Sequence, residues 1–146
     1  DIPGGAHLPA GTLLNTIRHE YAHAWYAHDP ALFARPWFRQ AFGLEYDECK
    51  TTPEHMWKAR LKRDRKYQKL RGTCRTKHER EALKARQFGN DFLSDYAATL
   101  AKEDFAESFA TYLRYRNSLG RFAGRPGIKK KLMAVEVAVQ IARAGV

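Results

Sequence analysis

The 146-residue sequence has only two cysteines, Cys49 and Cys74, which stand twenty-five positions apart. No Cys-x-x-Cys pair occurs, and no histidine lies at ligand spacing from either cysteine, which argues against a structural zinc site built on cysteine. A disulfide between them stays open, because the sequence supplies neither the redox compartment nor the distance between the two Cα atoms. Between the two alternatives we favour free thiols.

Long apolar runs are also missing. The longest, Leu132 to Ala142, is interrupted by Glu136 and Gln140 and predicts a core-facing helix rather than a membrane span. No signal peptide is visible, and the chain begins with Asp1 rather than methionine, which leaves open a removed leader, propeptide or upstream domain. For the compartment we favour the cytoplasm, with a secreted or delivered effector as the alternative.

Acidic residues are scarce in one stretch. From Lys50 to Arg86 there are fourteen Lys or Arg against four Asp or Glu, and this surplus equals the +10 net charge of the whole chain. Pro53 can open a helix that Gly72 breaks, and a second helix is expected from Lys77 to Phe88. We therefore predict a basic helical insertion over about residues 50–88. It carries no recognised nucleic-acid motif, so a solvated helical face and a polyanion or nucleic-acid partner both stay open.

What the sequence does contain is His19-Glu20-Tyr21-Ala22-His23, a His-Glu-x-x-His pattern. On a helix, positions four apart share a face, so His19 and His23 can direct two imidazole nitrogens at one metal ion. Glu20 lies about 100° round the same turn, where it can take a proton from a metal-bound water. This arrangement is typical of a zinc hydrolase. The alternative is that both histidines are polar residues beside an apolar stripe, for which we expect Leu14, Ile17, Tyr21, Ala24 and Trp25.

A second helix, beginning near Ala101, can complete the site. Phe105, Phe109, Tyr112, Leu113 and Arg116 mark one stripe, and Glu103, Ala106, Glu107 and Ala110 mark another that is largely opposite. The small alanines let this helix approach the first one closely. A catalytic zinc needs a third protein ligand, and helical spacing allows either Glu103 or Glu107 to provide it, with the other holding a histidine. We expect Asp104 only to complement the dipole of this helix from its first turn.

Other histidines and acids compete poorly for the third position. Asp29 stands where an extended His-Glu-x-x-His-x-x-Gly-x-x-His or Asp pattern places a ligand, but position 26 is tyrosine instead of glycine, and Asp29 before Pro30 is already expected to cap a short helix. His28 is one residue out of place. His7, His55 and His78 have no partner at useful spacing, and we expect them to be exposed.

These two segments together resemble the gluzincin metallopeptidases, the group that includes the anthrax lethal factor catalytic domain and a set of related bacterial zinc metallopeptidases. The resemblance covers residues 12–28 and 91–116, and it rests on His19-Glu20-Tyr21-Ala22-His23 and on the spacing of Tyr96, Glu103 and Glu107. It implies Glu103 as the third zinc ligand and Glu107 as a residue that holds a ligating histidine. It also implies that Tyr96 stabilises the transition state.

The resemblance has one departure. Such domains place a β-sheet before the active-site helix, and the eleven Pro- and Gly-rich residues ahead of Thr12 cannot form one. We therefore predict a mainly α fold over residues 1–146: a single zincin-like domain of five or six helices with little or no sheet. Other expected helices cover residues 12–28, 30–34, 36–42 and 129–144. The aromatic core is expected to include Phe33, Trp37, Phe38, Phe42 and Tyr46.

The function expected from the sequence is zinc-dependent hydrolysis of a protein or peptide substrate. Zinc would be bound by His19, His23 and Glu103, with Glu20 and Tyr96 as catalytic residues. Two alternatives come from other classes. One is a basic module that binds nucleic acid through Lys50 to Arg86 and keeps only a vestigial or structural zinc site. The other is a toxin or effector domain released from a larger polypeptide.

Overall fold

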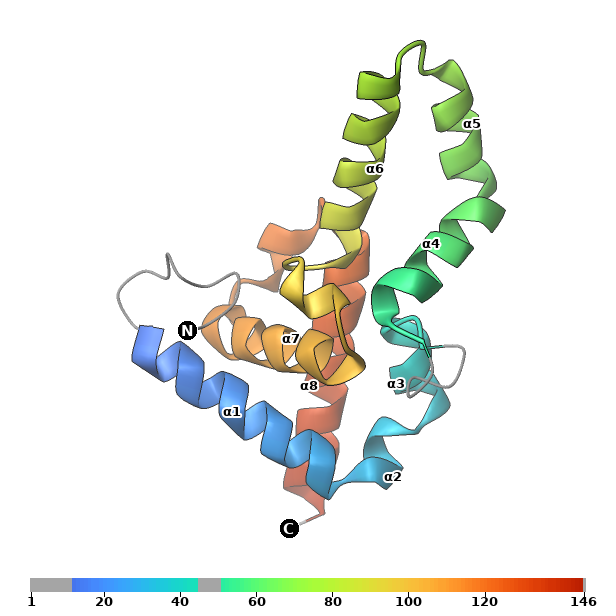
Figure 1. Cartoon of the computed structure of the whole chain (residues 1–146). Coiled ribbons are helices and arrows are strands. Elements are labelled where there is room, and N and C mark those ends of the chain that lie inside the picture. Colours follow the sequence, from blue (N-terminus) through green and yellow to red (C-terminus); the bar gives the residue numbers. More distant parts are fainter. Residues whose placement is uncertain (1–11, 45–50, 146) are drawn as a thin grey trace.

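The computed structural model describes residues 12–44 and 51–145, and over these ranges the chain is helical and has no strand. The prediction of a mainly α protein is confirmed for this part of the chain. The described ranges form eight α-helices rather than five or six, and two short 3-10 helices (Figure 1). The helices are α1 (Thr12–His28), α2 (Pro30–Phe33), α3 (Pro36–Ala41), α4 (Pro53–Arg63), α5 (Arg65–Thr73), α6 (Lys77–Asp91), η1 (Tyr96–Ala98), α7 (Ala101–Tyr115), η2 (Leu119–Phe122) and α8 (Pro126–Ala144).

The ends of the first three helices follow local sequence signals. After α1, the Asp29 side chain accepts a hydrogen bond from the Leu32 backbone N–H, and Pro30 occupies the first position of α2. This is the capping role expected for Asp29. After α3, Gly43 has a φ of +69°, a left-handed conformation that glycine adopts without a steric penalty. The expected end of this helix at Gly43 is therefore confirmed.

The basic stretch is helical, but its breaks lie elsewhere than expected. The helix from Pro53 ends at Arg63, because Asp64 turns the backbone and its carboxylate accepts a hydrogen bond from the Tyr67 N–H to cap α5. Gly72 lies inside α5 instead of breaking it, and α6 continues through Gly89 to Asp91. An isolated glycine costs a helix only about 1 kcal/mol, which packing can offset. The last helix likewise begins earlier than predicted, at Pro126.

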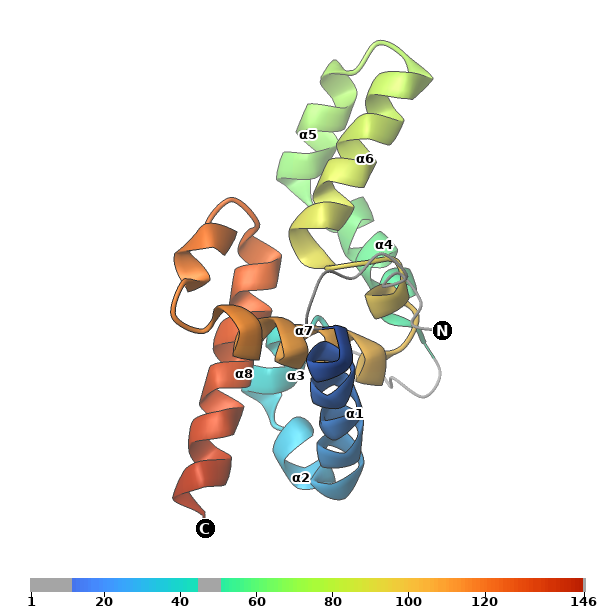
Figure 2. The ribbon, with the colours of Figure 1, turned by 90° about the vertical axis from the view of Figure 1, so that its left-hand side faces the viewer.

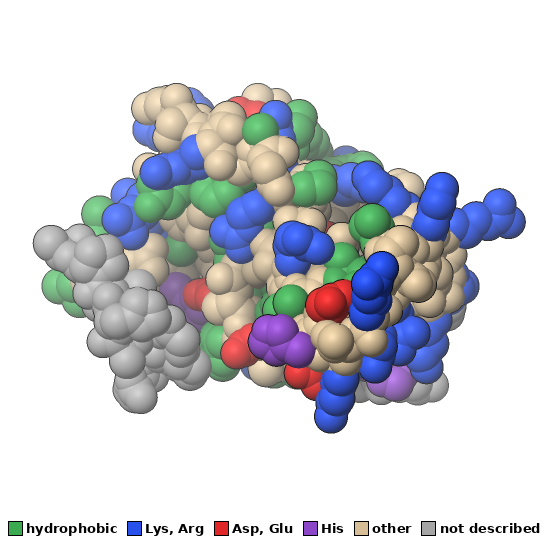
Figure 3. Space-filling model, turned by 90° about the horizontal axis from the view of Figure 1, so that it is seen from above, with side chains coloured by type: hydrophobic (Ala, Val, Ile, Leu, Met, Phe, Trp, Pro, Cys, Tyr) green, Lys and Arg blue, Asp and Glu red, His purple; other side chains and the backbone are tan. Residues whose placement is uncertain are grey.

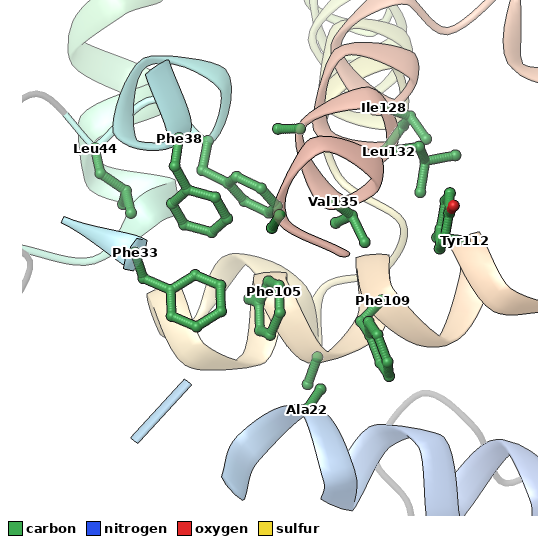
Figure 4. Packing of buried hydrophobic residues seen from close by; sticks show 14 of the residues in the cluster. Ala22, Phe33, Phe38, Leu44, Phe105, Phe109, Tyr112, Ile128, Leu132 and Val135 are labelled. Atoms are coloured by element: carbon green, nitrogen blue, oxygen red, sulfur yellow. The ribbon is translucent and has the colours of Figure 1, made fainter. Parts of the chain in front are cut away.

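The core is organised around α7, which is buried on most of its circumference. Helix α1 packs along one side of it, and α3 and α8 pack on the other (Figures 1 and 4). Phe33 and Phe38 meet Phe105 of α7 with ring centroids 4.7 and 5.8 Å apart. Phe42 is also buried and Trp37 is half-buried, as expected, while Tyr46 lies outside the described residues. The two stripes predicted on the second helix both find partners in this arrangement.

The apolar stripe expected on α1 is only partly buried. Trp25 packs against the core and the Tyr21 ring stacks on Phe109. Leu14, Ile17 and Tyr21 are 50%, 55% and 62% exposed, whereas Ala22 and His19 are buried against α7. A large apolar side chain at the closest point of the crossing would push the two helices apart, and Ala22 does not. The histidine face of α1 is therefore its buried face.

Helices α4, α5 and α6 form a hairpin that extends away from the core in two perpendicular views (Figures 1 and 2). The hairpin has a small apolar cluster of its own, which includes Trp57, Leu61, Tyr67 and Leu83. Its base is joined to α8 through Asp91, whose carboxylate accepts a hydrogen bond from Trp57 Nε1 at 2.9 Å and whose carbonyl accepts one from Lys131 Nζ.

A second set of bonds joins the hairpin to the start of α8. Arg125, which precedes α8, donates to the carbonyls of Gly89 and Phe92. Gly127, in the first turn of α8, lies so close to Asp91 that a Cβ there would collide with the carboxylate. The hairpin base is therefore held at several points. Among the described helices, none combines the length and the apolar character that a membrane crossing requires.

Candidate metal centre

Three side chains from α1 and α7 converge on one point. His19 Nε2 and His23 Nε2 lie 3.1 Å apart, and Glu103 Oε1 lies 3.4 Å from His19 Nε2 and also contacts His23 Nε2. One ligand atom from each of the three residues lies within 4.8 Å of the others. Two imidazoles and one carboxylate are the donor set of a three-ligand catalytic zinc site.

The helix crossing explains why these side chains meet. His19 and His23 are one turn apart on α1, so their rings project from the same face. Ala22 and Ala106 have no exposed surface, and they let the two helix backbones approach closely enough for the short Glu103 side chain to reach both rings. Small residues on both helices therefore determine the geometry of the cluster.

Burial distinguishes this cluster from a surface group of polar residues. His19 is 8% exposed and Glu103 is 4% exposed. Glu103 Oε1 is buried without a hydrogen bond of normal geometry, even though both Nε2 atoms are close to it. A buried carboxylate oxygen without a donor is costly unless a positive charge compensates it. A bound cation is one such compensation, so the residues present fit a metal ion.

The second glutamate of α7 contacts the other side of the His19 ring. Glu107 Oε2 lies 3.6 Å from His19 Nδ1. A carboxylate at this position favours the tautomer with the proton on Nδ1, which leaves the Nε2 lone pair directed toward Glu103 and His23. The two glutamates therefore occupy different positions: Glu103 lies at the point of convergence, and Glu107 lies behind one imidazole.

Ser94 extends the series of contacts from His19 through Glu107, and it was not singled out from the sequence. Its hydroxyl donates to Glu107 Oε1 at 2.6 Å and accepts from the Ala97 backbone N–H at 3.1 Å. The bond to Ala97 fixes the hydroxyl at the start of η1, so that Ser94 can orient Glu107. The local signal for this role is a serine just ahead of a helical turn, where its hydroxyl can accept from the backbone N–H three residues later.

Tyr96 borders the cluster from η1. Its ring stacks against that of His19, with the two centroids 6.3 Å apart. A hydrogen bond to Glu103, followed by partial burial and the nearby negative charges of Glu103, Glu107 and Glu20, raises the pKa of Tyr96 to about 12. The phenol therefore stays protonated at neutral pH and is available as a hydrogen-bond donor.

Glu20 lies beside the cluster rather than within it. Its side chain is exposed, and its charge is close enough to contribute to the raised pKa of Tyr96. The carboxylate of Glu20 does not belong to the group of His19, His23 and Glu103, whose ligand atoms converge. Glu20 is thus placed to act on a molecule that approaches the cluster from solvent.

The remaining candidates do not join the cluster. Asp29 caps α2, and His55 and His78 are exposed, as expected; His28 is exposed as well. His7 and Cys49 lie outside the described residues. Cys74 is a free cysteine.

Asp104 differs from the expectation that it only complements the helix dipole: it is 1% exposed and forms an ion pair with Lys131 at 2.8 Å. Burial, offset in part by Lys131, raises the pKa of Asp104 to about 6.

Comparisons of the chain with protein-family models, with curated proteins and with solved structures found no match.

Proposed function

We propose that the chain is a zinc-dependent metallopeptidase that hydrolyses peptide bonds, with His19, His23 and Glu103 as the zinc ligands. The observation that carries the proposal is the convergence of these three ligand atoms at a buried crossing, where Glu103 Oε1 has no hydrogen bond of normal geometry. Zinc takes this donor set and keeps a fourth position for water or substrate. When bound, it would supply a Lewis acid that polarises the carbonyl and acidifies water.

Glu20 acts as the general base in this proposal. It follows His19 directly, its side chain is exposed, and its charge is close enough to Tyr96 to help raise the pKa of that residue. It takes a proton from the attacking water and passes that proton to the leaving amine when the C–N bond breaks. Glu107 and Ser94 act on the other side of His19, where they fix the imidazole orientation.

Tyr96 stabilises the oxyanion. Its protonated phenol lies beside the cluster, and the substrate carbonyl would replace Glu103 as the acceptor of its hydrogen bond as negative charge develops on oxygen. A group that donates to the developing oxyanion and is not itself a metal ligand contributes to turnover more than to metal binding. We therefore expect substitutions of Tyr96 and of Glu20 to have the same consequence: activity is lost while the metal is retained.

The test measures zinc content and hydrolysis of an unstructured peptide library in parallel. Glu20→Gln preserves the shape of the side chain and removes the base, and Tyr96→Phe removes only the hydroxyl. We expect both variants to retain about one zinc per chain and to lose at least about 100-fold in turnover, as is typical of general-base and oxyanion groups. Full activity in Glu20→Gln would overturn the role of Glu20 as the general base, and a parent chain that hydrolyses no peptide in the presence of zinc would overturn the proposed hydrolysis. Full activity in Tyr96→Phe would remove only the role of Tyr96.

A further inference from the structure

The basic hairpin contains a groove of about 590 Å³ between α6 on one side and α4 and α5 on the other. Its floor includes the buried side chains Leu61 and Tyr67. Six cationic side chains line it: Lys58 and Lys62 from α4, Arg71 from α5, and Lys77, Arg80 and Lys84 from α6. On the corresponding end of the molecule, Lys and Arg side chains outnumber acidic ones on the visible surface (Figure 3).

Helical spacing places these charges opposite one another. Lys58 and Lys62 are one turn apart on α4, and Lys77, Arg80 and Lys84 follow one face of α6. Two helices of one hairpin thus present cationic faces to the same groove. Like charges placed this way repel one another weakly through solvent, and an anion between them relieves that repulsion.

Few of these charges are neutralised within the described chain. Lys58 pairs with Glu54 and Lys77 pairs with Glu81, both in exposed contacts longer than 3 Å. The other four, Lys62, Arg71, Arg80 and Lys84, form no ion pair with a carboxylate of residues 12–44 and 51–145. Glu81 is the one acidic residue among the described groove-lining side chains. The groove therefore has the charge of a polyanion site.

We infer that this groove binds the phosphate backbone of single-stranded nucleic acid. A single strand carries one charge per nucleotide and has sugars and bases that can contact an apolar floor, which here includes Leu61 and Tyr67. A duplex fits less well. The bases of a duplex are paired and stacked inside it, so they cannot lie against the floor of the groove, and only the phosphate backbone could reach the lining charges. The inference does not depend on the hydrolase proposal.

Charge removal inside and outside the groove tests this inference. One triple variant, Lys62→Gln, Arg80→Gln and Lys84→Gln, removes three lining charges. The matched control, Arg65→Gln, Lys66→Gln and Lys69→Gln, removes three exposed charges from the same hairpin that do not line the groove. Each variant loses three positive charges, so the two variants have equal net charge. Circular dichroism checks that each is folded.

The measurement is the fluorescence anisotropy of a labelled oligo(dT) of about 20 nucleotides, titrated at several salt concentrations from about 50 to 300 mM. We expect the groove variant to bind at least about 10-fold more weakly near 100 mM salt. The plot of log K against log salt should also become less steep, its slope decreasing in magnitude by about 2, as the loss of three phosphate contacts predicts. The control should lose less than about 3-fold.

Three outcomes would overturn the inference. The first is equal weakening by both triple variants, which would indicate a diffuse charge effect. The second is equal affinity for the oligonucleotide and for a duplex of the same length. The third is competition by polyglutamate as effective as that by unlabelled oligo(dT), which would favour an acidic peptide. Unchanged oligonucleotide binding in Glu20→Gln separates this site from the candidate metal centre.

Discussion

The two ends of this molecule handle charge in opposite ways. Around α7, His19, Glu103, Asp104 and Lys131 are buried, and each contacts an oppositely charged or ligating group from α1, α7 or α8. In the hairpin, the ion pairs Glu54–Lys58 and Lys77–Glu81 are exposed, and most groove cations have no acidic partner in the described chain. Desolvated charges are costly and persist only with compensation, whereas solvated charges cost little. Buried charge is therefore the better guide to a built site here.

Removal of the converging carboxylate should have the largest effect. Glu103→Ala leaves two imidazoles without a third ligand, and we expect zinc affinity to fall by more than about 100-fold, with activity lost at the same time. Dialysis against a weak chelator, followed by metal analysis, measures this. Asp29→Ala is a matched control, because it removes a carboxylate that caps α2 instead of contacting the histidines. Retention of stoichiometric zinc in Glu103→Ala would contradict the proposed ligand set.

The second-largest effect is expected at the buried Asp104–Lys131 ion pair, and it is an effect on stability rather than on metal binding. Asp104→Ala leaves Lys131 buried without a carboxylate partner, with the Asp91 carbonyl and the rings of Phe42 and Phe92 still in contact, and we expect a loss of about 3–5 kcal/mol in the free energy of unfolding. Urea denaturation measures it. The double variant Asp104→Leu with Lys131→Met removes both charges and should recover most of the loss. A double variant no more stable than Asp104→Ala would show that the charges are not the cause.

Residues behind the ligands should have a smaller effect. Glu107→Ala removes the carboxylate near His19 Nδ1, and we expect zinc affinity or turnover to fall by about 10- to 100-fold without emptying the site at saturating metal. Ser94→Ala should give a weaker change in the same direction, because the serine acts only through Glu107. Metal titration of each variant with a zinc-binding dye distinguishes them. Complete zinc loss in Glu107→Ala with retention in Glu103→Ala would reverse the two roles.

Local signals predicted most of the helices, and they failed where two signals competed. Caps and glycines defined the ends of α1, α2 and α3. The capping role of Asp64 was missed because an aspartate inside a charged run resembles an ordinary surface acid. Its carboxylate nevertheless caps the start of α5. Gly72 and Gly89 were overestimated as breaks, since helix propensity is a weak preference that neighbouring contacts override.

The candidate site could be predicted to a similar degree. Spacing alone identified His19 and His23 as neighbours and left Glu103 and Glu107 as alternatives. The choice between the two glutamates depends on how deeply α7 packs against α1, which is set by the contact of Ala22 with the alanines of α7 and not by any periodic pattern. The stripe on α1 was misjudged at Leu14 and Ile17 for the same reason: hydrophobicity favoured these two residues, but close packing favoured the small Ala22.

The smallest expected effect is at an ion pair of the hairpin. Glu54 and Lys58 lie one turn apart on α4 with side chains about half exposed, so solvent screens their 3.4 Å contact. A double-mutant cycle with Glu54→Gln and Lys58→Gln should give a coupling energy of about 0.3–0.5 kcal/mol in urea denaturation, and about 0.5 M salt should abolish it. The cycle also cancels any effect of Glu54 on the dipole of α4, which a single variant would include. A salt-insensitive coupling above about 1 kcal/mol would mean that the hairpin excludes solvent as the core does, and the contrast between the two ends would fail.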